Sequence, residues 1–344
     1  VDSAVEAARR REGPQVAGWV NAVLRRVDRR REYWLQAVPT GPDSLYNLAV
    51  RYSHPPWLVR RLARNISPDI LEKFLAWNNR RPRVNLRINP FRAEVIEIVA
   101  SLANVGIPAR RSPIDPQYVI LEHHGDPAHL DPVRNGRAVV QDQAQGLPSR
   151  IAAPWPGERV LDLCAAPGGK TGHLAELCVR SRIVATDKSV ERLCLVDEMV
   201  SRLAYGNVTV KPFEDVLTGK ERFDCVLVDA PCTGVGVLAR RPDLRWRLRP
   251  DDIPRMAAVQ LQLLRYAAER VAVGGRIIYS TCSVMPEENG EVVAKFLSEH
   301  RGFREVPAGD FLPPGTADAN GRLNLLGPEI GGDGVFAVRL ARRG

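Results

Sequence analysis

The sequence predicts an α/β protein whose larger part is a doubly wound parallel sheet. Residues 136–344 alternate between short apolar runs and stretches of helical periodicity, the pattern of parallel strands joined by helices. The first run leads into the glycine turn Pro167-Gly168-Gly169-Lys170 and a helix start. Two later runs each lead to a cysteine, Cys232 and Cys282. Because ligands bind outside the carboxyl ends of such strands, these observations predict a ligand crevice at that edge of the sheet.

The N-terminal segment is predicted to be helical. Residues 1–35 are rich in arginine and carry an apolar stripe at helical spacing, formed by Val20, Val23, Leu24 and Val27. One or two helices cannot bury a core alone, so we expect this segment to be the tail of a larger helical domain. Residues 36–54 contain prolines and a glycine typical of a linker, and helical periodicity returns from Pro56 to Asn79.

A small α+β module is predicted next. A strand at 84–88, a helix at 93–105 and a strand at 118–121 follow one another. Arginines surround them, at positions 80, 81, 83, 87, 110 and 111. Two interpretations stay open: a module that binds RNA through these arginines, or a packing domain whose arginines face solvent.

The elements of the larger part are expected in alternation. Strands are predicted at 159–163, 182–187, 207–211, 223–229, 275–280, 303–306 and 334–340, and helices at 170–178, 189–203, 253–272 and 288–300. The longest helix carries one apolar stripe at steps of three and four residues. The last strand follows a long loop rich in proline and glycine, which predicts an antiparallel insertion.

The net charge and the length of the apolar runs limit the kinds of partner that the chain is expected to bind. The formal charge is 49 − 40 = +9 and the isoelectric point is near 9.5, which favours a polyanion such as RNA over a neutral partner. A solvated basic surface would give the same balance. No apolar run approaches the roughly 20 residues of a membrane span, so no membrane association is predicted.

The six cysteines are expected to be reduced thiols of a cytoplasmic protein. None forms a CxxC pair, so neither a metal site nor a disulfide scaffold is predicted. Cys178, Cys194 and Cys225 fall on apolar faces or in a strand and are expected in the core. Cys232 and Cys282 differ, because adjacent parallel strands would bring their thiols to one crevice, with the strand ends roughly 5 Å apart.

Three aspartates support a nucleotide-like cofactor in the same crevice. Asp187, Asp215 and Asp229 follow or end successive predicted strands, where a carboxylate can accept hydrogen bonds from ribose hydroxyls. The glycine turn is neither a dinucleotide fingerprint nor a phosphate-binding loop of the Walker type. Each aspartate alone is more often a cap or turn residue, but together they predict an adenosine-containing cofactor.

Four stretches resemble the RsmB (Sun/Fmu) group of RNA 5-methylcytosine methyltransferases, within the Nop/NSUN family. They are Leu161-Asp162-Leu163-Cys164-Ala165-Ala166-Pro167-Gly168-Gly169-Lys170-Thr171, Asp229-Ala230-Pro231-Cys232-Thr233-Gly234, Arg240-Arg241-Pro242-Asp243, and Tyr279-Ser280-Thr281-Cys282-Ser283 continuing to Pro286-Glu287-Glu288-Asn289. Asn21-Ala22-Val23-Leu24-Arg25-Arg26 is similar to the end of the NusB-like RNA-binding domain of that group.

The resemblance implies a fold and three regions. The fold would be a class I methyltransferase, with a Rossmann-like doubly wound sheet. Residues 1–35 would be the remnant of the helical NusB-like domain, residues 36–135 linker helices and the α+β RNA-binding module, and residues 136–344 the methyltransferase domain. A monomer is expected.

The cofactor implied by the resemblance is S-adenosylmethionine. Its methionine part would lie against Cys164, Ala165, Ala166, Pro167, Gly168, Gly169 and Lys170. Asp187 would hold the ribose, Asp215 the adenine edge, and Asp229 would lie beside the methyl-transfer centre. The chain departs from the family at Phe213-Glu214-Asp215, where glycine usually precedes the aspartate.

The implied reaction is methylation of a cytosine at C5 in small-subunit (16S) ribosomal RNA. Attack of a thiolate at C6 makes C5 nucleophilic. The family pattern makes Cys282 the nucleophile, Cys232 the residue that promotes release, and Asp229 the acid near N3. Two alternatives stay open: a DNA cytosine-C5 methyltransferase, in which the Pro-Cys cysteine is the nucleophile, and a non-catalytic RNA-binding ribosome-assembly factor.

The basic segment 240–249 follows the first cysteine. It contains Arg240, Arg241, Arg245, Trp246, Arg247 and Arg249. These residues either hold RNA phosphates and stack a base, or form a loop in which the tryptophan is packed and the arginines are solvated.

Overall fold

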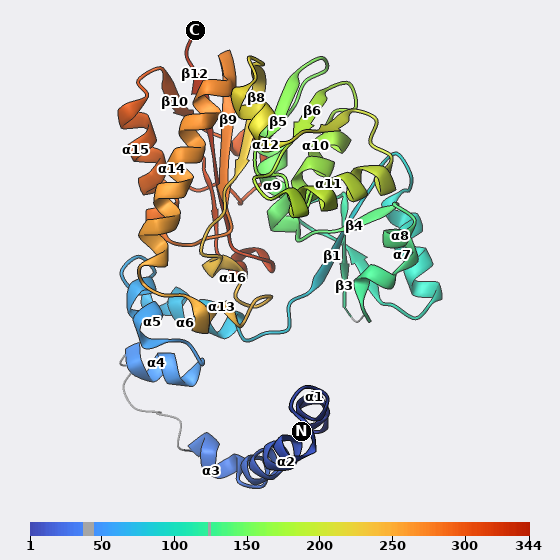
Figure 1. Cartoon of the computed structure of the whole chain (residues 1–344), viewed down its shortest axis with the longest axis vertical. Helices are drawn as coiled ribbons and strands as arrows, with labels where there is room; N and C mark the ends of the chain where they lie inside the picture. Colours follow the sequence, from blue (N-terminus) through green and yellow to red (C-terminus); the bar gives the residue numbers. More distant parts are fainter. Residues whose placement is uncertain (37–44, 123–124) are drawn as a thin grey trace. The chain divides into compact units, whose positions relative to one another are not determined.

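The computed structural model describes residues 1–36, 45–122 and 125–344. The chain forms two compact units, Val1–Ile66 and Ser67–Gly344. The first contains helices and the second contains both predicted sheets (Figure 1).

The first unit consists of helices α1 (Asp2–Glu12), α2 (Pro14–Arg29), α3 (Arg31–Gln36), α4 (Leu45–Arg51) and α5 (Pro56–Leu62). No residue of α1 is buried, and only Ala17 is buried in α2. The side chain of Trp19 is 69% exposed. The predicted helical segment is therefore confirmed, while its relation to a NusB-like domain stays a prediction. Of the predicted linker, residues 37–44 lie outside the described part and Leu45–Arg51 form a helix.

A four-stranded antiparallel sheet opens the second unit after helix α6 (Pro68–Trp77). Its strands are β1 (Val84–Ile88), β2 (Ala109–Arg111), β3 (Tyr118–Leu121) and β4 (Ala138–Val140), in the order β2-β3-β1-β4, with helix α7 (Val95–Asn104) between β1 and β2. The predicted strand–helix–strand module is confirmed. Strand β4 belongs to this sheet although it lies wholly past the expected boundary at 135, and the division into regions stays a prediction.

Arg87 corrects one expectation about this module. Its side chain is fully buried and forms an ion pair with Glu176, with 2.7 Å between Nε and Oε2. A second hydrogen bond joins Arg87 to the backbone oxygen of Gly169. Arg87 therefore ties the small sheet to the glycine turn and does not face RNA.

The large sheet has the order β10-β12-β9-β8-β5-β6-β7, with β11 paired to β12. Its strands are β5 (Arg159–Asp162), β6 (Arg182–Ala185), β7 (Val208–Val210), β8 (Phe223–Asp229), β9 (Val271–Thr281), β10 (Phe303–Val306), β11 (Leu323–Leu325) and β12 (Val335–Arg342). Strands β5 to β9 pair in parallel, and β12 pairs with β9 antiparallel. The strand order reverses between β5 and β8, which is where such sheets bind ligands.

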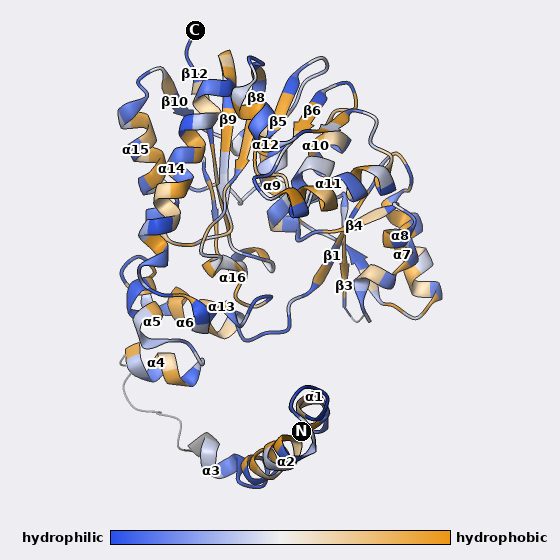
Figure 2. Cartoon of the chain, in the orientation of Figure 1, coloured by the Kyte–Doolittle hydropathy of each residue, from blue (hydrophilic) through white to orange (hydrophobic). Residues whose placement is uncertain are grey.

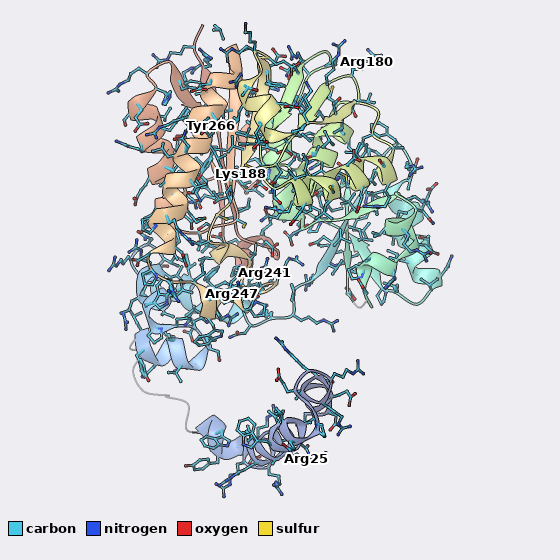
Figure 3. The ribbon with its side chains drawn as sticks, viewed as in Figure 1. Arg25, Arg180, Lys188, Arg241, Arg247 and Tyr266 are labelled. Carbon is cyan, nitrogen blue, oxygen red and sulfur yellow. The ribbon has the colours of Figure 1, made fainter. Side chains whose placement is uncertain are left out.

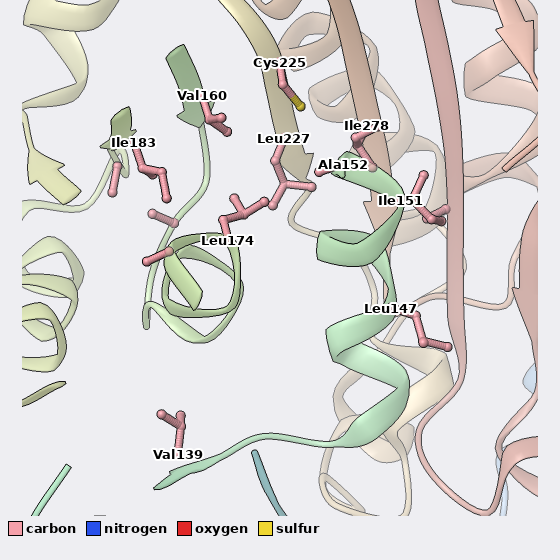
Figure 4. Packing of buried hydrophobic residues seen from close by; sticks show 14 of the residues in the cluster. Val139, Leu147, Ile151, Ala152, Val160, Leu174, Ile183, Cys225, Leu227 and Ile278 are labelled. Carbon is pink, nitrogen blue, oxygen red and sulfur yellow. The ribbon is translucent and has the colours of Figure 1, made fainter. Parts of the chain in front are cut away.

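Helices cover both faces of this sheet. Helices α9 (Gln143–Ala152), α10 (Gly169–Leu177) and α11 (Val190–Leu203) pack on one face (Figure 4). Helices α12 (Phe213–Thr218), α14 (Asp252–Arg270) and α15 (Gly290–Glu299) pack on the other. Figure 2 shows hydrophobic residues concentrated along the central strands, as expected for a sheet buried on both faces.

The sequence did not predict α9. Pro148 lies inside this helix, and an internal proline normally argues against one. Nor did it predict α12 or the short helices α8 (Asp131–Arg134), α13 (Leu244–Arg247) and α16 (Gly327–Ile330). Of the three cysteines expected in the core, Cys225 is buried, Cys178 is half-buried and Cys194 is exposed on α11. The expectation for Cys194 was therefore wrong.

Candidate active site

A pocket of about 670 Å³ opens at the carboxyl ends of β5, β6, β8 and β9, within the size range of small-molecule sites. Its lining includes both predicted cysteines and two of the three predicted aspartates, together with groups that the sequence did not single out. The lining residues used below are Cys164, Ala166, Asp187, Lys188, Arg192, Phe213, Asp229, Cys232, Arg241 and Cys282.

The two thiols meet in this pocket. Strands β8 and β9 are parallel neighbours in which Asp229 lies opposite Ser280. Each cysteine follows its strand within three residues, so both side chains reach the same space. Their Sγ atoms are 3.1 Å apart, and both cysteines are partly exposed.

Cys232 lies in an environment that opposes its ionisation. The hydrogen bond with Cys282 holds the pKa of the Cys232 thiol well above its usual value, and burial and the negative charge of Glu288 raise it further. Either sulfur can donate in the contact between the two thiols. Only a thiolate is a strong nucleophile, so the thiol that attacks must first lose its proton.

Asp229 is held on two sides. Ser280 Oγ donates to its Oδ1 over 2.7 Å, and Lys170 Nζ lies 2.7 Å from its Oδ2. Lys170 also donates to Gln145 Oε1 over 3.2 Å. These contacts orient the Asp229 carboxylate while it still lines the pocket beside the thiols.

The glycine turn forms the loop between β5 and α10. Gly168 has φ +104°, and a Cβ there would lie 2.5 Å from Cε of Met199, so only glycine fits without rearrangement. The first backbone N–H groups of α10 follow at once, and such groups attract negative charge.

Apart from Asp215, the predicted cofactor residues divide into two groups. Cys164, Ala166, Asp187 and Asp229 line the pocket. Ala165, Pro167, Gly168, Gly169 and Lys170 form the adjoining turn but are not among the residues that line it. Asp187 is nearly buried and accepts hydrogen bonds from the backbone N–H groups of Ala166 and Ser189, at 3.2 and 3.0 Å.

Asp215 lies apart from this group. It is exposed on α12 and is not among the lining residues, whereas Phe213, two residues earlier, is buried and lines the pocket. The adenine contact of Asp215 stays a prediction. The signal for Phe213 was an aromatic residue directly after the third parallel strand, at the position where the sequence departs from the family pattern.

The basic segment 240–249 has both inward-facing and outward-facing residues. Arg240 binds Asp142 and Asp333, and Arg245 is buried and donates to Asn79 Oδ1 over 2.7 Å. Arg241, Trp246, Arg247 and Arg249 are exposed. Arg241 also lines the pocket, and Figure 3 shows it close to Arg247. The expectation of a packed tryptophan among solvated arginines is therefore wrong, because Trp246 is exposed while Arg240 and Arg245 turn inward. Contact of the outward-facing residues with RNA stays a prediction.

Asp162 makes the stability of the folded chain depend on pH. The residue is fully buried behind the turn, and burial raises its pKa from 3.8 to about 7, with the nearby Asp229 adding to the shift and the Thr171 hydroxyl opposing it. Between these two pH values the folded chain keeps a proton that the unfolded chain has released, so stability falls as pH rises through this window. We expect the advantage of Asp162→Asn over the unsubstituted chain to grow by up to about 4 kcal/mol between pH 4 and pH 8. Urea unfolding across this range measures the difference, and parallel stability curves would contradict it.

Two negative findings concern the described part of the chain. No helix there is long and apolar enough to cross a bilayer. Within residues 1–36, 45–122 and 125–344, no cluster of three or more His, Cys, Asp or Glu side chains could hold a metal ion.

Known proteins similar to this chain share both of its sheets. A family model described as 16S rRNA methyltransferase RsmB/F matches residues 150–341. A model described as the ferredoxin-like domain of RsmF/B-like methyltransferases matches residues 54–127.

Curated relatives align along nearly the whole chain. Ribosomal RNA small subunit methyltransferase B of Klebsiella pneumoniae (strain 342) is 36% identical over 98% of this chain and 76% of its own length. The probable ribosomal RNA small subunit methyltransferase B of Bacillus subtilis (strain 168) is 33% identical over 100% of this chain and 78% of its own length.

Solved structures share the fold. One crystal structure, 32% identical, aligns with 98% of this chain and 75% of its own, with a TM-score of 0.84. NSun6 from Pyrococcus horikoshii, solved with SFG, is 19% identical and aligns with 82% of this chain and 97% of its own, with a TM-score of 0.72.

Proposed function

Because the chain belongs to the RsmB/F family of 16S rRNA methyltransferases, we propose that it methylates a cytosine of that RNA at C5 through a covalent cysteine adduct. The chain is an S-adenosylmethionine-dependent RNA methyltransferase. One observation carries the covalent step: two thiols lie 3.1 Å apart in one pocket beside an oriented carboxylate.

The pocket suits S-adenosylmethionine, which supplies a methyl group on a sulfonium sulfur. We assign the methionine part to the turn 164–170, of which Cys164 and Ala166 line the pocket. We assign the ribose to Asp187 and the adenine face to Phe213, which is buried and aromatic. A contact between Asp215 and the adenine edge is still proposed. Phe213 is the better supported adenine contact, because Asp215 is exposed on α12.

We assign nucleophilic attack to Cys282. Its thiolate adds to C6 of the cytosine, which converts C5 into an enamine carbon able to accept a methyl group. Asp229, oriented by Ser280 and Lys170, would stabilise the developing charge near N3. A water molecule then takes the C5 proton, and the electrons of that C–H bond form the C5–C6 double bond and expel the Cys282 thiolate by β-elimination.

We assign release of the product to Cys232. This thiol touches Cys282, so its S–H can protonate the Cys282 thiolate that elimination expels from C6. The alternative of a DNA cytosine-C5 methyltransferase requires the opposite assignment, with Cys232 as the thiolate. The match to a family model of 16S rRNA methyltransferases favours RNA over DNA as the substrate.

The target base must leave its stack to reach the pocket. Lys188, Arg192 and Arg241 line the opening and supply positive charge for the flanking phosphates. We therefore propose a looped or flipped cytidine as the substrate. The chain is further proposed to act as a cytoplasmic monomer, with regions 1–35, 36–135 and 136–344 as predicted from the sequence.

Bisulfite sequencing of RNA from a deletion strain tests the function. We expect one cytosine of 16S ribosomal RNA to lose its protection from conversion, and the purified chain to restore the methyl group in vitro with S-adenosylmethionine. Unchanged ribosomal cytosines would contradict the proposal. Failure to bind S-adenosylmethionine in calorimetry would instead favour a non-catalytic assembly factor.

A further inference from the structure

Glu288 is a buried carboxylate that joins the two loops carrying the cysteines. It ends the short 3₁₀ helix Pro286–Glu288 and is fully buried. Its Oε1 accepts from the backbone N–H of Thr233 over 2.8 Å, and its Oε2 accepts from Thr233 Oγ1 over 2.5 Å and from Ser283 Oγ. Thr233 directly follows Cys232, and Ser283 directly follows Cys282. One carboxylate therefore bonds to the neighbour of each thiol.

Further contacts fix Glu288 itself. Gln260 Nε2 on α14 donates to its Oε1 over 3.1 Å and also to the backbone oxygen of Pro231 over 2.9 Å. Tyr279 Oη donates to the backbone oxygen of Glu288 over 2.5 Å. The next residue, Asn289, accepts from Thr281 Oγ1 over 2.6 Å and donates to the backbone oxygen of Ser283 over 2.9 Å. Glu288 is thus anchored from α14 and from β9.

The charge of Glu288 has no cationic partner in the described ranges, where no lysine, arginine or histidine forms an ion pair with it. Burying a carboxylate without a counterion is costly, and a neutral side chain could hold two loops at less cost. A negative group this close also opposes ionisation of neighbouring thiols. Both features suit a role in the reaction better than a role in folding alone.

We propose that Glu288 is a positioning residue that sets the distance between Cys232 and Cys282 and, through its charge, opposes the ionisation of both thiols. The proposal rests on the function proposed above and deepens it. Glu288 acts through the cysteines and touches neither RNA nor cofactor.

Two substitutions of Glu288 separate its role in positioning the loops from the effect of its charge. Glu288→Ala removes the carboxylate that bonds to both loops and leaves only the weak Thr233–Ser283 hydroxyl contact and the contact between the thiols. A displacement of about 1 Å at a reacting group lowers the rate by about 100-fold. We expect that loss in kcat, with KM for RNA and for S-adenosylmethionine unchanged. Glu288→Gln keeps an oxygen for Thr233 and Gln260 and lets the two hydroxyls turn to accept from its amide. We expect it to retain most of kcat at its own optimum.

The effect of the Glu288 charge is measured from the pH dependence of kcat in Glu288→Gln. The charged and titratable groups around the thiol pair include Glu288, Tyr279, Asp229, which is paired with Lys170, and Arg241, which lines the same pocket. Loss of the nearest negative charge makes the first thiol ionise at lower pH, and the second likewise. The whole profile of kcat is therefore expected to move to lower pH. Glu291→Gln on α15, an exposed acid nearby in the chain, is the matched control and should leave the profile in place.

The geometry has a readout that needs no RNA and no methyl transfer. The azo compound diamide oxidises two adjacent thiols to a disulfide, and the two thiol hydrogens reduce it to the hydrazine. We expect diamide to join Cys232 and Cys282 rapidly in the unsubstituted chain and in Glu291→Gln, and at least tenfold more slowly in Glu288→Ala, as measured by mass spectrometry of the linked peptides. Thr233→Val is the second variant, in case Glu288→Ala does not fold. It loses the hydroxyl bond to Glu288 and keeps the backbone bond, so we expect its thiols to oxidise more slowly than those of the unsubstituted chain, by less than tenfold.

Unchanged oxidation rates in both the Glu288 and Thr233 variants, or a pH profile of Glu288→Gln that coincides with that of the unsubstituted chain, would overturn the proposal. If the unsubstituted chain still methylates RNA, these results would leave the proposed function intact. If the unsubstituted chain does not methylate RNA but its two thiols oxidise rapidly, the proposed function would be refuted and the positioning of the thiols would stand.

Discussion

Replacing Cys282 with alanine is expected to abolish methylation. Cytosine C5 is a poor nucleophile until sulfur adds at C6, and the alanine variant has no group that can make that bond from the same position. Loss of an enzyme's nucleophile lowers the rate by on the order of 10⁴-fold or more. Transfer of labelled methyl groups from S-adenosylmethionine to 16S ribosomal RNA measures the effect.

The control for this variant is Cys194→Ala, which removes an exposed cysteine on α11 and should methylate at the normal rate. Both variants should bind S-adenosylmethionine equally well in calorimetry, because Cys282 is not among the residues assigned to cofactor binding. Residual activity of Cys282→Ala above a few percent would contradict its assignment as the nucleophile.

Replacing Cys232 with alanine is expected to stop the reaction at the covalent adduct. Attack and methyl transfer need only Cys282, so the first turnover proceeds, but release lacks the thiol that touches Cys282 at 3.1 Å. One methyl group per enzyme should be transferred, followed by accumulation of a protein–RNA species stable to denaturing electrophoresis. Gel analysis with labelled RNA measures its yield over time.

The double variant Cys232→Ala with Cys282→Ala should form no such species, which shows whether the adduct depends on the second thiol. Accumulation of the adduct in Cys282→Ala alone would reverse the two roles. That result would match the chemistry of the DNA cytosine-C5 methyltransferases.

The meeting of the two thiols could be predicted from the sequence, because each follows a strand at the same edge of a parallel sheet. The prediction needed only that the two strands be neighbours, and β8 and β9 are. The same reasoning predicted Asp187 and Asp229 at that edge, both of which line the pocket. Apolar runs sufficed for these strands because a strand that is buried on both faces is apolar at nearly every position.

Other features depend on tertiary contacts that periodicity does not encode. Helix α9 contains Pro148 and still forms, because its apolar face packs on the sheet beside Leu174 and Leu227. Arg240 and Arg245 turn inward toward acceptors far away in the chain, including Asp142 and Asn79. The sequence could not separate them from Arg241.

Glu288 is the clearest example of this limit. The motif that contains it was recognised, but its acceptor role requires Thr233 from one loop and Ser283 from another to converge on one carboxylate. Asp215 shows the converse. Its position after a strand predicted a cofactor contact, whereas the backbone continues into α12 and leaves Phe213 at the pocket.

The most direct test of the covalent mechanism uses 16S ribosomal RNA in which 5-fluorocytidine replaces cytidine. Fluorine at C5 cannot leave as a proton, so the unsubstituted enzyme should remain bound to its target base after methyl transfer. Digestion and mass spectrometry would then identify the modified peptide. We predict the modified nucleotide on Cys282. Attachment to Cys232, or no attachment while methylation of normal RNA proceeds, would contradict the account.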